Sequence, residues 1–232
     1  MRALIYADWI IIRKTILRYL GFALLILSPI VILANGDEEF APGTSAAVMC
    51  VVMVTFYLVI GLFSADETNG WELVRLTLPT STHQVVRSRY VFMVLVLAIM
   101  AVVGTILGIV VEWVIPLFHG VLTVPRGGLV VCLASLGACL MLMVFLAIEM
   151  PIMFWKGMTK ARMALSIPML LPLLLTIEPT RDAVMSFAEK LEGIEKALGT
   201  PVPIFIAIAA IACVLYVASM LLSERVYAAR DF

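Results

Sequence analysis

Six apolar segments, each close to the length needed to cross a bilayer, constrain this chain more than any other feature. A helix that crosses the hydrocarbon core needs about 20 apolar residues. The segments are residues 16–34, 46–64, 91–111, 129–155, 161–177 and 202–222. Apolar residues make up 63% of the chain, against about 45–50% in soluble domains, so lipid has to cover surface that a soluble core could not hide. We therefore expect an all-α integral membrane protein with six transmembrane helices in a single domain, residues 1–232.

The distribution of positive charge predicts how the spans are oriented. If the N-terminus is cytoplasmic, the inner segments hold 12 of the 16 lysines and arginines, and the outer loops hold 4. The inner ones are Arg2, Arg13, Lys14, Arg18, Arg75, Arg87, Arg89, Lys156, Lys160, Arg162, Arg225 and Arg230. Because basic residues accumulate on the cytoplasmic side, we expect a multi-pass protein of the plasma membrane with both termini in the cytoplasm.

Two segments outside the spans are expected to be helical. Residues 2–18 combine basic side chains with Tyr6 and Trp9, which suits an interfacial helix at the level of the lipid headgroups. Residues 180–198, before the sixth span, place five apolar side chains at 3-4-3-4 spacing on one face. This pattern predicts an extracellular amphipathic helix that lies on the membrane or caps the bundle; a linker helix packed on the protein would give the same pattern.

The inner segment 65–90, between the second and third spans, is long for a helix connection. Asn69-Gly70 is a turn signal, and Pro79 stops the short helix expected over residues 71–78. Ser81 to Gln84 has capping-box spacing, so a new helix is expected to start there and run into the third span. Arg87 and Arg89 are expected at the membrane edge, with their charged ends reaching toward water. The segment thus predicts a short helix held below the membrane, for which an ordinary surface helix is the alternative.

Glu149 is the acidic residue most clearly at risk of burial in a span. It precedes Pro151 near the end of the fourth span. A carboxylate within the membrane is costly and marks a candidate functional site. The alternative is that Glu149 reaches the interface and pairs with Lys156 or Arg162.

Motifs for chemistry by this chain itself are missing from the sequence. There is no GxxxxGK[ST] phosphate loop, no HExxH and no GxSxG, which argues against an enzyme. The net charge is zero, so nothing points to nucleic acid. The four cysteines lie in apolar runs without a CxxC pair, and we expect small packed side chains rather than a disulfide or metal site.

Two inner segments resemble the permease subunits of type-two ABC transporters, in a compact bacterial six-helix branch. In the first, an acidic stretch with a tryptophan leads to Leu-Pro and then to a helix that ends in Arg-Tyr. Its matching positions here are Glu67, Trp71, Glu72, Leu78, Pro79, Ser81, Val85, Arg89 and Tyr90. The second segment follows the fourth span and matches at Pro151, Lys156, Gly157, Lys160, Ala161 and Arg162.

The resemblance implies a transmembrane subunit of an ATP-driven exporter. Two permeases, identical or paralogous, would pair in the lipid bilayer, and each would dock one copy of a separate ABC ATPase. This chain would bind no cofactor, and ATP and magnesium would sit on the ATPase. The residues implied for coupling to the ATPase are Trp71, Glu72, Val74, Arg75, Leu78 and Pro79, with Lys156, Gly157, Lys160 and Arg162 in the second inner loop. The short outer loops favour peptides, drugs or lipid-like molecules as substrates.

Two other functions remain open at the level of the sequence. An ion-gradient-driven carrier or channel could use Glu149 as its proton or ion site. A membrane scaffold or immunity protein would bind a partner and transport nothing. Dependence of transport on an ATPase separates the first from the exporter, and the absence of any transport identifies the second.

Overall fold

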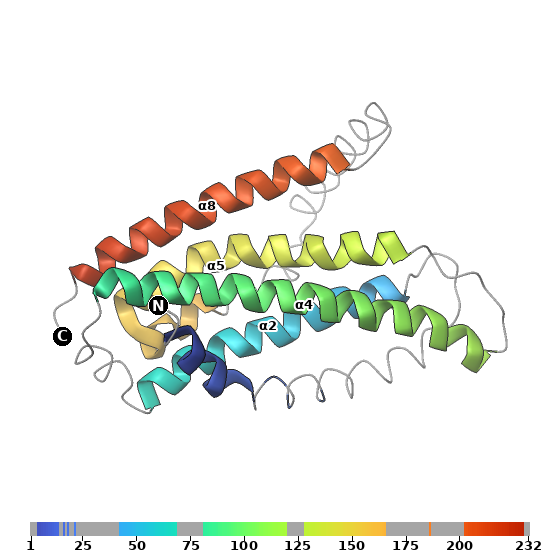
Figure 1. The fold of residues 1–232 in the computed structure, drawn as a ribbon, viewed down its shortest axis with the longest axis horizontal. Coiled ribbons are helices and arrows are strands. Elements are labelled where there is room, and N and C mark those ends of the chain that lie inside the picture. Colours follow the sequence, from blue (N-terminus) through green and yellow to red (C-terminus); the bar gives the residue numbers. More distant parts are fainter. Residues whose placement is uncertain are drawn as a thin grey trace. The chain divides into compact units, whose positions relative to one another are not determined.

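The structure, a computed structural model, describes residues 4–13, 16, 18, 21, 42–68, 81–119, 128–165, 186 and 202–229. Every element among these residues is helical, and none of them forms a strand. Residues 4–13 form an N-terminal helix, followed by α2 (Pro42–Thr68), α4 (Thr82–His119), α5 (Gly128–Leu165) and α8 (Val202–Ala228) (Figure 1). The chain divides into two compact units, Met1–Leu142 and Met143–Phe232.

Among the described residues, four helices are long and apolar enough to cross a membrane. The crossing stretches are Cys50–Thr68, Thr82–Val114, Gly128–Trp155 and Val202–Ala228. Each contains most or all of one predicted span, so the second, third, fourth and sixth spans are confirmed as apolar helices. The predicted first and fifth spans, 16–34 and 161–177, and the outer helix 180–198 fall largely outside the described residues.

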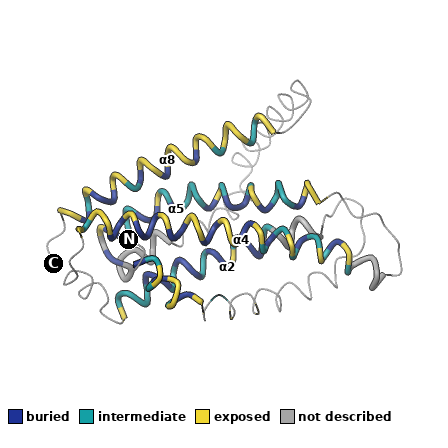
Figure 2. The backbone as a smooth tube through the Cα atoms, viewed as in Figure 1, coloured by how far each residue is buried: buried dark blue, intermediate teal, exposed yellow. Residues whose placement is uncertain are grey.

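In the first unit, α2 and α4 pack against each other along 3-4 spaced apolar faces. The face of α2 buries Val51, Val54 and Leu58, and that of α4 buries Met93, Val96 and Met100. Figure 2 shows buried stretches that alternate with exposed ones along α4 and with stretches of intermediate burial along α2. Because Asp66, near the end of α2, bonds to Arg89 in the early part of α4, the two helices run antiparallel.

The start of α5 joins α4 through two polar contacts. The hydroxyls of Thr105 and Ser135 lie 2.6 Å apart, and the thiol of Cys139 donates to the carbonyl of Leu97 at 3.4 Å. The contact further along α5, at Cys139, meets an earlier residue of α4 than the contact at Ser135 does. These helices therefore also run antiparallel. All four cysteines are free thiols in the structure.

In the second unit, α5 and α8 run in the same direction. The Ser219 hydroxyl contacts the carbonyl of Ala147, and the rings of Phe154 and Tyr227 meet edge to face with centroids 5.5 Å apart. If α5 and α8 both cross the membrane in the same direction, the chain between them must cross once in the opposite direction. The predicted fifth span would supply that crossing. That fifth span remains a prediction.

Candidate functional site

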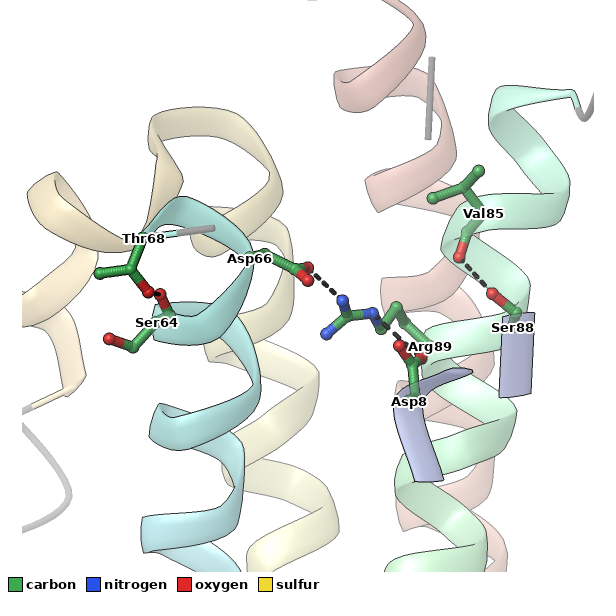
Figure 3. A network of polar contacts seen from close by, with 7 residues as sticks. All are labelled: Asp8, Ser64, Asp66, Thr68, Val85, Ser88 and Arg89. Carbon is green, nitrogen blue, oxygen red and sulfur yellow. Dashed lines mark hydrogen bonds and ion pairs between the residues drawn. The ribbon is translucent and has the colours of Figure 1, made fainter. Parts of the chain in front are cut away.

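A buried ion cluster joins three chain segments at the end of the first unit where α2 ends and α4 begins. Asp8 comes from the N-terminal helix, Asp66 from the last turn of α2, and Arg89 from α4 (Figure 3). The Nε atom of Arg89 lies 3.2 Å from Oδ2 of Asp8, and its Nη2 donates a hydrogen bond to Oδ2 of Asp66. The arginine and Asp8 side chains are each 1% exposed, so the guanidinium bridges two carboxylates away from water.

An aromatic ring completes the surroundings of the guanidinium. Its central carbon lies 5.2 Å from the centroid of Phe63, which is one turn before Asp66 on α2. A cation over an aromatic face is stabilised by the quadrupole of the ring, and the planar guanidinium suits this position better than an ammonium. Arg89 is therefore held by a carboxylate and a ring from α2 and by a second carboxylate from the N-terminal helix.

The expectation that both basic residues of early α4 reach toward water is wrong for Arg89. Arg87 is exposed, as predicted, whereas Arg89 lies among the largest fully buried side chains of the described residues. The physical reason is pairing: carboxylates beside two of the guanidinium nitrogens offset part of the cost of removing the charge from water. The sequence placed Arg89 in a family motif but did not identify its partners, Asp8 and Asp66.

Local sequence explains how α4 presents Arg89. Ser81 caps the helix: its hydroxyl accepts a hydrogen bond from the backbone N–H of Gln84 at 3.3 Å, and its carbonyl accepts from Gln84 and Val85. This confirms the predicted helix start. From there, Val85, Val86, Arg89 and Tyr90 are buried and share one side of the helix.

The N-terminal helix shows the same logic. Leu4, Asp8 and Ile12, at i, i+4 and i+8, are its buried residues. Tyr6, Trp9 and Ile10 are exposed. An acid in the middle of an apolar stripe is the sequence signal for a buried partner of Asp8.

The predicted ATPase-coupling residues belong to the stretch between α2 and α4. Trp71, Glu72, Val74, Arg75, Leu78 and Pro79 all lie outside the described residues. The helices on either side are described, however: α2 continues through Thr68 and α4 begins at Thr82. Helix therefore occupies both ends of the predicted segment 65–90, and residues 69–81 connect them.

The second inner loop begins at a break in α5. Gly157 has φ 72° and ψ 168°, so the helix is interrupted there. A side chain would be strained in this conformation, which explains glycine at this position. The break comes two residues after the predicted end of the fourth span. Lys156, Lys160 and Arg162 lie on α5, but their side chains are outside the described part.

The second unit contains a polar contact that compensates for a proline. Pro151 lies inside α5 and has no N–H to donate to the carbonyl of Ala147, four residues earlier. The Ser219 hydroxyl of α8 donates to that carbonyl at 2.5 Å. A neighbouring helix thus satisfies the backbone group freed by the proline, as membrane helices require.

Glu149 lies in the same stretch of α5 and is 5% exposed. Among the described residues, no group donates a hydrogen bond to its Oε1 atom. The burial of Glu149 agrees with the expectation from the sequence that this acid is at risk of burial in a span. Its role, and the predicted pairing with Lys156 or Arg162, stay predictions.

Comparison with known protein families gives one result. Residues 3–228 match the family model described as ABC-2 family transporter protein. The chain belongs to this family. The match spans nearly the whole chain, so the resemblance seen in two inner segments is confirmed. ABC-2 family proteins of this kind are membrane components of transporters, generally without catalysis of their own. Neither the curated proteins nor the solved structures contain a match.

Proposed function

We propose that this ABC-2 family chain is the transmembrane subunit of an ATP-driven exporter. Two permease chains would form the pathway, and each would dock a separate ABC ATPase on the cytoplasmic side. The observation that carries the proposal is that Arg89 ties together the ends of α2 and α4, the two membrane-length helices between which segment 69–81 lies in the chain. A force that the ATPase exerts on this segment would therefore act on both α2 and α4.

The charge distribution supports the cytoplasmic position of the segment. With 12 of 16 basic residues on one side, the end of α2 and the start of α4 face the cytoplasm. ATP binding would close the two ATPase subunits and displace the segment, tilting α2 and α4. Transport then follows as a population shift between inward- and outward-facing states, driven by their different affinities for ATP.

The substrate class follows from the resemblance and from the short outer loops. Peptides, drugs or lipid-like molecules suit such a compact permease better than polysaccharides or large proteins. ATP and magnesium would be held by the ATPase, whose phosphate loop this sequence lacks.

Trp71 is the residue on which to test the proposal. Buried aromatic side chains dominate protein interfaces, and removal of such an anchor costs about 2 kcal/mol or more, roughly a thirtyfold loss of affinity. We expect Trp71→Ala to weaken binding of the ABC ATPase that we propose as its partner by that factor, measured with purified proteins in nanodiscs. Trp113→Ala is the matched control, since Trp113 is 61% exposed near the other end of α4.

Two results would count against the proposal in different ways. If the wild-type chain binds no ATPase and transports without ATP, the exporter is wrong. If it binds one and Trp71→Ala leaves the affinity unchanged, only the assignment of the coupling segment is wrong.

The second candidate function is an ion-gradient-driven carrier that uses Glu149. The observation in its favour is the burial of this carboxylate in a membrane-length helix. It predicts transport that stops when the ion gradient is collapsed and continues without ATP.

A further inference from the structure

The ion cluster connects more than α2 and α4, the two helices on either side of segment 69–81. Its third member, Asp8, brings in the N-terminal helix, which is separated from α4 by more than sixty residues of chain. Arg89 forms ion pairs with both Asp8 and Asp66. One side chain thus ties three chain segments together at the base of the first unit.

Packing alone does not explain why charged groups stand here. Apolar side chains of similar volume often hold helices together as well as a buried ion pair does, or better. A guanidinium adds direction, because its nitrogens lie in a fixed plane and each points to a different partner. Here Nε lies beside Asp8 and Nη2 donates to Asp66, so Arg89 offers a direct path by which a displacement of α2 reaches the N-terminal helix.

The opposite face of the N-terminal helix carries the side chains that would feel such a displacement. Tyr6 is 63% exposed and Trp9 38%, and aromatic residues of this kind prefer the headgroup region. The helix also leads into the predicted first span, 16–34. A movement of this helix would therefore shift an interfacial anchor and reach a further span.

We propose that Arg89 is a positioning residue for energy coupling. Through Asp66 and Asp8, it transmits the movement of segment 69–81 to the N-terminal helix, so that this helix moves together with α2 and α4. This inference rests on the proposed function, since it needs an ATPase that moves the segment. It adds a third element to the coupled set and assigns Asp8 and Asp66 as its contacts.

A reporter on the N-terminal helix tests the transmission directly. The four native cysteines are replaced, and Tyr6→Cys is labelled with an environment-sensitive bimane. The permease with its ATPase is placed in nanodiscs, and the emission is recorded before and after addition of the non-hydrolysed ATP analogue AMP-PNP with Mg²⁺. We expect a spectral change in the otherwise unaltered chain.

Asp8→Asn breaks one arm of the cluster at nearly constant volume. We expect the nucleotide-dependent change to fall about fivefold or more, the lower range of typical allosteric coupling, while ATPase affinity stays within about twofold. Asp8→Glu, which restores the charge, should recover most of the response. Arg87→Gln is the matched control, because Arg87 is an exposed arginine on the same helix.

The outcomes separate this inference from the proposed function. A full reporter response in Asp8→Asn overturns it, as does a parallel loss of response and ATPase binding. If both Asp8→Asn and Asp66→Asn fail to fold, the cluster is an element of stability only and the inference is also wrong. If ATPase binds and depends on Trp71 but the reporter never responds, the exporter stands and the transmission to the N-terminal helix falls.

Discussion

Two sites of this protein, one in each unit, accommodate buried polar groups in different ways. In the first, the charges of Asp8, Asp66 and Arg89 come from three segments and meet one another. In the second, a neutral hydroxyl, that of Ser219, satisfies a backbone carbonyl, and Glu149 is buried with no described donor to its Oε1 atom. The ion cluster connects three chain segments through its charges. The Ser219 hydroxyl instead satisfies one backbone carbonyl that Pro151 leaves without a donor.

The energetics of the two arrangements should differ accordingly. Removal of one partner from a buried ion pair leaves an uncompensated charge and costs about 3–5 kcal/mol. Loss of a neutral donor leaves one unsatisfied carbonyl, for about 1–3 kcal/mol. A buried carboxylate without a partner gains nothing from its charge, so neutralising it should cost little. This ranking yields three predictions.

The largest effect is expected for Arg89→Met. The substitution keeps an elongated side chain but leaves Asp8 and Asp66 facing each other without a cation. We expect the free energy of unfolding to fall by about 3–5 kcal/mol, measured by denaturant titration of the purified protein in detergent. Arg87→Met, on the exposed side of α4, should change it by less than about 0.5 kcal/mol. Equal effects of the two substitutions would show that Arg89 is not a buried partner.

A smaller effect is expected for Ser219→Ala in the second unit. The carbonyl of Ala147 would lose its donor, because Pro151 cannot supply one, and the unfolding free energy should fall by about 1–3 kcal/mol. Pro151→Ala restores a backbone N–H at that position. In the Pro151→Ala background, therefore, Ser219→Ala should cost less than about 0.5 kcal/mol, a coupling that a double-mutant cycle measures directly. Additive effects would mean that the hydroxyl and the proline are unrelated.

The same contrast explains what the sequence could predict. Hydrophobic length locates four spans, and the cap at Ser81 locates the start of α4, since both are local properties. The predicted end of the fourth span at residue 155 lies two residues before the break at Gly157, but the break itself was not predicted from the sequence. The partners of Arg89 were not predicted either, because pairing among residues 8, 66 and 89 depends on how three helices pack. Only the position of Asp8 between the apolar residues Leu4 and Ile12 indicates that this acid has a buried partner.

The smallest effect is expected for Glu149→Gln. The substitution keeps the shape and removes the charge, and a buried ion that loses no partner is relieved of a desolvation cost. We therefore expect the free energy of unfolding to stay within about 0.5 kcal/mol or to rise, and ATP-driven transport to persist. Asp66→Asn is the matched control, since it neutralises a carboxylate that does have a cation and should destabilise. Loss of more than about 1 kcal/mol in Glu149→Gln would instead reveal an ion pair, for which Lys156 and Arg162 are the candidates. A stable variant in which gradient-driven transport is abolished would favour the carrier. It would contradict the expectation that Glu149 is dispensable for transport.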